Sequence, residues 1–159
     1  MSARNALFAE AARLIAGADG LLVAAGAGMG VDSGLPDFRG NAGFWRAYPA
    51  LADARIAFEE IACPDAFRRT PALAWGFYGH RLNLYRHTRP HAGFAMLRAI
   101  AARLSRGGFV FTSNVDGQFQ RAGFAEAEVC EVHGSIHHLQ CMAGCDGAIM
   151  PADDFIPDV

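Results

Sequence analysis

Residues 21–40 read LLVAAGAGMGVDSGLPDFRG, an apolar run followed at once by a glycine-rich loop. A short apolar run bounded by glycine is typical of a buried strand in a parallel sheet. Glycines after such a strand let the backbone approach a phosphate, so the segment predicts a nucleotide site. The alternative is a glycine-rich turn that serves only the fold. Val31 stands where a dehydrogenase fingerprint would have its third glycine, which disfavours hydride-transfer enzymes.

Two further apolar stretches predict strands, and polar residues follow both of them. Residues 109–111 lead into the segment TSNVD, and residues 129–132 lead into His133. In an open α/β sheet, ligands bind at the carboxyl ends of the strands. We therefore expect an α/β fold with a Rossmann-like parallel sheet. The residues expected to converge at its edge are Gly26, Asn114, Asp116 and His133.

Helices are predicted before and between these strands. Ser2 can cap a first helix that covers the sheet, and Gly17 is placed to end it. Residues 41–70 have an irregular pattern that predicts a long, partly mobile loop. Pro71 is expected to begin a helix with one face that carries Leu73, Phe77, Arg81 and Leu84. A further helix is expected from about His91 to Leu104.

Four motifs, in the same order along the chain as in the family, carry a resemblance. The glycine-rich segment resembles the sirtuin signature G-A-G-x-S-x-x-S-G-I-P-D-F-R-G, and the sirtuin T-Q-N-I-D appears as residues 112–116. The R-A-G motif is residues 121–123, and H-G-S is residues 133–135. Two positions depart from the family, since Gly30 replaces a serine and Ser113 a glutamine. We expect these changes to weaken or alter cofactor binding, not to abolish it.

The resemblance implies that residues 1–159 are the amino-terminal part of a sirtuin catalytic domain. Residues 1–40 and 107–135 would form the Rossmann-like part, with an incomplete sheet. Residues 41–106 would form the cofactor loop and a helical part. Residues 136–159 would begin a small zinc-binding module.

The resemblance also implies roles at a site for NAD. Gly26, Ala27 and Gly28 would approach the phosphates, Phe38 would shield the nicotinamide ribose, and Asp116 would hold the nicotinamide carboxamide. Asn114 would position the ribose and a water, and His133 would act as general base on a ribose hydroxyl. The remaining residues expected to bind the cofactor are Asp37, Arg39, Ser113 and Val115.

Tyr78 and Arg81 are three residues apart on a predicted helix, so they share one face. A guanidinium and a phenol on one face could bind a carboxylate together. The pair resembles the Tyr-x-x-Arg motif of sirtuins that remove succinyl, malonyl or glutaryl groups. An ordinary amphipathic helix with a solvated Arg81 is the alternative.

Cys141 and Cys145 lie where the sirtuin zinc module begins. Their C-x3-C spacing supplies two ligands, and a structural zinc site needs four. The two cysteines could therefore bind Zn²⁺ or be inert reduced thiols, and the sequence leaves both interpretations open.

Composition narrows the classes of function. All 14 cationic residues are Arg, so lysine-dependent phosphate loops and Schiff bases are excluded. A net charge of -2 disfavours nucleic acid partners, and no apolar run predicts a membrane span or a signal peptide, so we expect a cytoplasmic protein. The resemblance implies an NAD-dependent deacylase that acts on acylated lysine side chains of proteins. The alternatives are an NAD glycohydrolase, an ADP-ribosyltransferase or a non-catalytic NAD-binding module.

Overall fold

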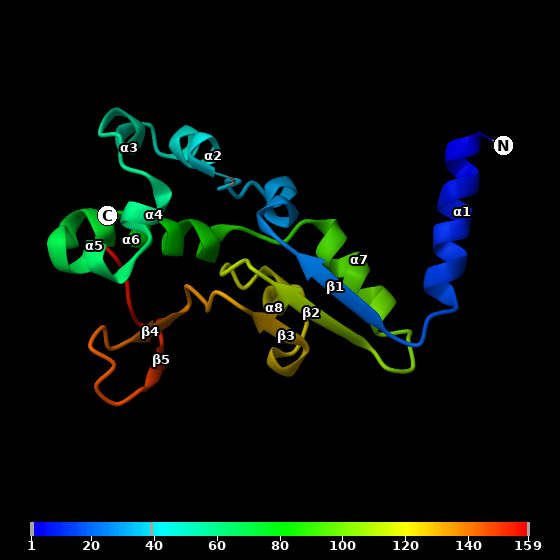
Figure 1. Cartoon of the computed structure of the whole chain (residues 1–159). Coiled ribbons are helices and arrows are strands. Elements are labelled where there is room, and N and C mark those ends of the chain that lie inside the picture. The colour runs from blue at the N-terminus through cyan, green and yellow to red at the C-terminus, as the bar shows by residue number, and fades with distance from the viewer. Residues whose placement is uncertain (1, 39, 159) are drawn as a thin grey trace.

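A parallel sheet and a cluster of helices form two neighbouring units in the computed structural model, which describes residues 2–38 and 40–158 (Figure 1). A small antiparallel hairpin lies beside the helical unit. Each unit has its own apolar core, because the sheet buries Phe94 and Phe119 while the helical cluster buries Phe44 and Phe77.

The sheet contains the three predicted strands in the order β1-β2-β3. They are β1 (Leu21–Ala25), β2 (Gly108–Thr112) and β3 (Val129–Glu131), and both pairings are parallel. Ala25 lies opposite Thr112, and Thr112 lies opposite Glu131, so the three strands end side by side. The predicted α/β fold with a parallel sheet is confirmed.

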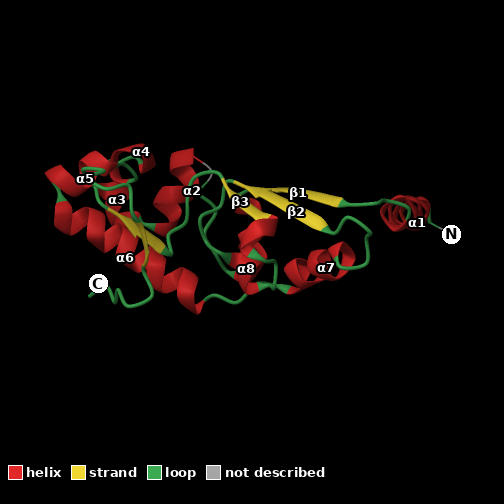
Figure 2. Ribbon diagram, turned by 90° about the horizontal axis from the view of Figure 1, so that it is seen from below, coloured by secondary structure: helices red, strands yellow, loops and turns green. Residues whose placement is uncertain are grey.

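Within residues 2–38 and 40–158, helices cover one face of this sheet and leave the other uncovered. In Figure 2, α7 (Ala92–Ala101) and α8 (Gln118–Arg121) both lie on the same side of the strands. On the opposite face, Leu22, Phe109 and Phe111 are exposed to solvent. The prediction that residues 21–25 form a fully buried strand is therefore wrong for one face.

Helix α1 (Ala3–Ala16) forms as predicted and ends at Gly17, but it does not cover the sheet. It has no buried residue, and it stands away from the rest of the chain in Figure 1. Leu7 is 72% exposed. The Ser2 side chain makes no capping hydrogen bond, and its backbone carbonyl accepts the first helical N–H groups instead. The prediction that α1 covers the sheet is wrong, because its apolar residues pack against no other element of the described chain.

The stretch predicted to be a long, partly mobile loop is a series of short helices, so that prediction is wrong. They are α2 (Gly40–Ala47), α3 (Pro49–Asp53), α4 (Phe58–Ile61) and α5 (Pro64–Arg69). Each buries one apolar residue in the helical core. A helix of one or two turns is too short to display a 3.6-residue apolar period, which explains why the pattern was irregular.

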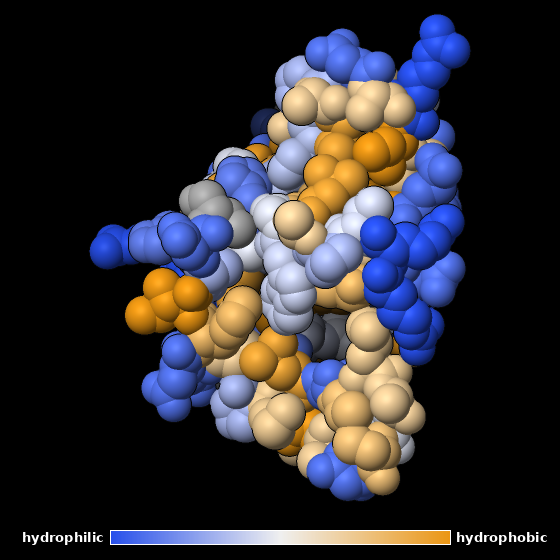
Figure 3. Space-filling view, turned by 90° about the vertical axis from the view of Figure 1, so that its left-hand side faces the viewer, coloured by the Kyte–Doolittle hydropathy of each residue, from blue (hydrophilic) through white to orange (hydrophobic). Residues whose placement is uncertain are grey.

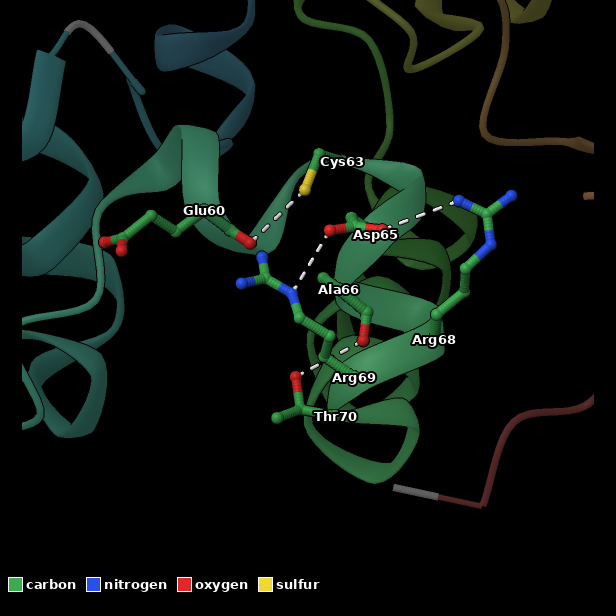
Figure 4. Close-up of polar contacts among 7 residues, drawn as sticks. All are labelled: Glu60, Cys63, Asp65, Ala66, Arg68, Arg69 and Thr70. Carbon is green, nitrogen blue, oxygen red and sulfur yellow. Dashed lines mark hydrogen bonds and ion pairs between the residues drawn. The ribbon is translucent and has the colours of Figure 1, made fainter.

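Local polar contacts close the junction between α4 and α5 (Figure 4). The Cys63 thiol donates to the carbonyl oxygen of Glu60 at 3.4 Å, and Pro64 begins α5. Asp65 pairs with Arg68 at 3.5 Å and with Arg69 at 3.3 Å. Exposed pairs of this kind add little stability, so buried apolar residues hold these helices in place.

Helix α6 (Pro71–His87) begins at the predicted proline and spans the helical unit. Its buried face includes Phe77 and Arg81, two of the four residues expected to share one face, while Leu73 of the same set is exposed. The 3-10 helix η1 (Ala27–Ser33) follows β1, and the 3-10 helix η2 (Glu126–Glu128) precedes β3. The hairpin of β4 (His138–Gln140) and β5 (Ile149–Pro151) was not predicted.

None of the helices that the structure describes is long and apolar enough to span a bilayer.

Replacing Phe94 by Ala is expected to destabilise the chain by about 3–5 kcal/mol, since the ring is fully buried. It packs against Phe119 with ring centroids 4.8 Å apart. Leu7→Ala removes an exposed apolar side chain and should change the free energy of unfolding by less than about 0.5 kcal/mol. Denaturant unfolding measures both, and equal losses would contradict the described packing.

Candidate functional site

A cavity of about 680 Å³ lies where the carboxyl ends of the strands meet the helical unit. Its walls come from the loop after β1, the loops after β2 and β3, helices α4 to α6, the hairpin and Phe155. Seen from the end of the molecule with the helical unit and the hairpin, the surface is hollowed and apolar residues gather beside the hollow (Figure 3). The predicted site residues that line this cavity are Ala27, Phe38, Tyr78, Arg81, Ser113, Asn114, Val115, Asp116 and His133.

Hydrogen bonds tie the loop after β2 to the end of β1. The Thr112 hydroxyl donates to the carbonyl oxygen of Ala25 at 3.1 Å and accepts the Asn114 N–H at 3.0 Å. The Asn114 side-chain amide donates to the carbonyl oxygen of Gly26 at 3.0 Å. Asn114 is therefore held in place with its amide oxygen still able to accept a hydrogen bond.

The glycine-rich loop forms the second wall. Gly26 is extended, with φ of −135°, and Ala27 contributes to the cavity lining. At Gly30, where the sirtuin signature has serine, an added Cβ would lie 3.1 Å from Leu35 Cδ1. A side chain there would press on the buried Leu35, so the departure from the signature fits the local packing. Gly26, Gly28 and Asp37 are not among the lining residues, and Arg39 lies outside the described residues.

Asp116 is a buried carboxylate in the cavity wall. Its Oδ1 accepts the N–H of Gln118 at 3.0 Å. Loss of solvent raises the pKa of Asp116, while the Gln118 N–H and the nearby charges of His137 and Arg81 oppose that rise. The second carboxylate oxygen can accept an amide N–H from a ligand.

His133 follows β3 and lines the same cavity. It is exposed, and its ring makes no hydrogen bond to another residue that the structure describes. Both ring nitrogens are thus available to a ligand.

Arg81 is a buried cation surrounded by aromatic rings. It is 6% exposed, and its guanidinium carbon lies 4.9 Å from the ring centroid of Phe38 and 5.8 Å from that of Tyr78. Its Nε and Nη2 donate to the Tyr85 hydroxyl at 3.1 and 2.8 Å. None of the ion pairs between described residues involves Arg81.

The phenols near Arg81 carry no charge to balance it. Burial raises the pKa of Tyr78 and of Tyr85, and it raises the pKa of Tyr48 to about 12. All three hydroxyls therefore stay protonated at neutral pH. Tyr48 also donates to or accepts from His80 Nδ1 at 2.9 Å. No tyrosinate therefore balances the charge of Arg81, and no ion pair between described residues does so.

Cys141 and Cys145 lie in the connection between β4 and β5, outside the cavity lining, with their sulfur atoms 2.9 Å apart. Within residues 2–38 and 40–158, no three His, Cys, Asp or Glu side chains are grouped to hold a metal ion. Two thiols alone do not make a structural zinc site. The zinc-binding module is not shown, and zinc at this pair stays a prediction.

Sequence reasoning missed the aromatic wall of the cavity. Phe58 and Phe67 come from the segment assigned to a loop, and Phe155 comes from beyond the hairpin. No local pattern marks them, because they meet only through the tertiary fold. Tyr85 had a usable signal, since it lies one helical turn after Arg81 on the same face.

Comparison with known proteins places the motifs in one family. The model of the Sir2 family matches residues 26–153. An NAD-dependent protein deacylase 2 of Pyrobaculum aerophilum is 40% identical over 132 residues, which is 82% of this chain and 48% of the relative. The mitochondrial NAD-dependent protein deacylase sirtuin-5 of Danio rerio is 35% identical, over 77% of this chain and 38% of the relative. The chain thus spans about half the length of these curated relatives or less.

Solved structures of Sir2 homologues also resemble this chain. A mutant Sir2 homologue in complex with 2'-O-acetyl ADP ribose has a TM-score of 0.72 and 30% identity, over 94% of this chain and 56% of that one. A complex of a Sir2 homologue with NAD has a TM-score of 0.62 and 32% identity, over 80% and 45% of the two chains. The resemblance inferred from the four motifs is confirmed.

Asp116→Asn is expected to stabilise the ligand-free chain at pH 7. Because the pKa of Asp116 is raised on folding, the folded state loses stability as the pH rises through that raised value. Asparagine carries no charge and can still accept the Gln118 N–H. The melting temperature of the variant should exceed that of the parent at pH 7, and the gap should shrink toward the ordinary aspartate pKa of about 3.9. Asp53→Asn, at an exposed position, is the control, and an identical shift there would contradict the burial argument.

Proposed function

Because the chain belongs to the Sir2 family, we propose that its cavity binds NAD and that a protein containing it removes acyl groups from lysine side chains of proteins. One observation carries the proposal. Asn114, Asp116 and His133 follow two different strands and line a single cavity beside the glycine-rich loop. An amide, a carboxylate and an imidazole at one edge are the groups that this reaction requires.

The residues present fit the cofactor. The cavity has the volume of a small-molecule site, and its polar groups lie at the strand ends while aromatic rings form the opposite wall. Backbone N–H groups of the glycine-rich loop can bind phosphate oxygens without any lysine. The solved structures of Sir2 homologues include an NAD complex and a 2'-O-acetyl ADP ribose complex, which supports the same ligand class here.

Each polar residue then has a distinct task. NAD, when bound, supplies the ribose that receives the acyl group as nicotinamide leaves. Asp116 would accept the N–H of the nicotinamide carboxamide at its second oxygen. Asn114, fixed by Gly26, would present its amide oxygen to the ribose or to a water. His133 would take a proton from a ribose hydroxyl, and Phe38 would shield the ribose from solvent.

We further propose that the acyl group carries a carboxylate, as a succinyl group does. Arg81 is buried without an ion-pair partner among the described residues, which is costly unless a ligand supplies the anion. The neutral phenol of Tyr78 lines the cavity on the same helix and can donate to that carboxylate. Asp116 is the nearby carboxylate whose charge acts on Arg81, but no ion pair joins the two side chains.

The alternatives at the same cavity are an NAD glycohydrolase, an ADP-ribosyltransferase and a module that binds NAD without turnover. Incubation with NAD and an acylated peptide separates the possibilities. Acyl-ADP-ribose identifies a deacylase, free ADP-ribose identifies a glycohydrolase, ADP-ribosylated protein identifies a transferase, and unchanged NAD identifies a binding module.

His133→Ala is expected to reduce turnover by about 10²–10⁴-fold, since a general base contributes on that order. NAD affinity should change little, because the ring makes no contact that shapes the cavity. The measurement uses a protein of full Sir2 length that contains this chain, with calorimetry for NAD and product formation for turnover. His87→Ala removes another exposed histidine, and its turnover should match the parent. Normal turnover of His133→Ala would exclude the assigned role.

Arg81→Met should reverse the preference for succinyl-lysine over acetyl-lysine peptides. A charge-assisted hydrogen bond contributes about 1.5–3 kcal/mol, and methionine keeps the side-chain bulk without the charge. The ratio of kcat/KM for the two peptides measures the effect in the same full-length protein. Arg68→Met, which removes an exposed arginine of α5, should leave the ratio unchanged. If neither variant alters the ratio, Arg81 is a structural residue only.

A further inference from the structure

His137 joins two loops of the site. Its Nε2 lies 3.0 Å from the carbonyl oxygen of Asp116. A carbonyl oxygen can only accept, so Nε2 carries the proton and donates it. The preceding residue, Ile136, donates its N–H to the carbonyl oxygen of Val115 at 2.9 Å. Two neighbouring hydrogen bonds thus hold the loop that carries His133 against the loop that carries Asp116.

The packing around the ring is close. A Cβ added at Gly117 would lie 2.9 Å from His137 Cδ2, a distance that real Cβ atoms do not tolerate. Gly117 also has φ of 65°, a left-handed conformation that favours glycine. The turn after Asp116 is therefore shaped to receive the imidazole ring.

The backbone of His137 connects the loops to a third segment. Its carbonyl oxygen accepts the N–H of Ala152 at 2.8 Å. The carbonyl oxygens of Ala152 and Phe155 accept hydrogen bonds from Arg86 of α6, at 2.7 Å for Phe155. His137 stands where the two loops and the segment after the hairpin meet.

The charges that face the ring are two carboxyl groups. Burial raises the pKa of Asp116 and of Glu131, and the charge of His137 opposes the rise at both. Glu131 in turn accepts the Gly117 N–H at 3.3 Å and an N–H of the Gln120 side chain at 3.1 Å. The imidazole thus acts on the Asp116 loop through a direct hydrogen bond, beside these two carboxyl groups.

We infer that His137 is a positioning residue for Asp116. Its hydrogen bond fixes the peptide unit of Asp116 relative to His133. The link to nicotinamide binding rests on the proposed function, whereas the coupling of the two loops does not. No role in proton transfer is assigned to His137, because its Nε2 proton is engaged by the Asp116 carbonyl.

Three variants and one control test the inference. His137→Leu removes the donor, His137→Gln places an amide N–H near the position of Nε2, and His137→Asn is polar but too short to reach. His87→Leu is the control, since His87 is exposed on α6. Amide hydrogen exchange of Ile136 reports the coupling of the loops. Calorimetry with NAD and with ADP-ribose reports the position of Asp116, because only NAD carries the carboxamide.

Exchange at Ile136 should be about tenfold faster in His137→Leu and His137→Asn, and NAD affinity should fall about tenfold, with ADP-ribose affected little. His137→Gln should restore both. Unchanged exchange in the folded Asn variant, or equal losses for NAD and ADP-ribose, would overturn the inference. Absence of NAD binding by the unsubstituted chain would reject the proposed function instead, and the exchange comparison would still decide whether the loops are coupled.

Discussion

The hydrogen bond from the Asn114 amide to the carbonyl oxygen of Gly26 links the ends of β1 and β2, and the arrangement of the site depends on it. These two residues are far apart in the sequence and become neighbours only because the strands are parallel and in register. The bond brings the loop after β2 to the glycine-rich loop. Asp116 is then held at the same edge by its own Gln118 contact and by the loop after β3. The polar side chains of the site therefore meet because the parallel strands end side by side at one edge of the sheet.

The sheet and its polar edge could be predicted from sequence because both depend on local signals. Apolar runs mark β1, β2 and β3, and parallel strands bring the loops at their carboxyl ends to one edge. The helical unit could not be predicted in the same way. Its helices α2 to α5 are too short for a period to appear, and the aromatic core that holds them assembles only in three dimensions. The hairpin was missed because its two strands have three residues each.

The position of α1 shows a different limit of sequence reasoning. The apolar spacing of its residues correctly predicted a helix but wrongly predicted that it packs on the sheet. Spacing describes which residues share a face, and it does not identify the surface that the face meets. For Arg81 the reverse holds. The sequence placed Tyr78 and Arg81 on one helix face, and the structure added the burial and the aromatic surroundings that make the cation chemically significant.

The uncovered face of the sheet has a consequence for how the chain behaves in solution. Leu22, Phe109 and Phe111 present apolar area to water, and β1 is an edge strand with one row of backbone groups unpaired in the sheet. Salts that are excluded from protein surfaces strengthen the burial of such area, while cooling weakens it. We therefore expect the solubility of the isolated chain to fall with sulfate or phosphate concentration and to recover at low temperature, with the exposed face of the sheet as one contributor.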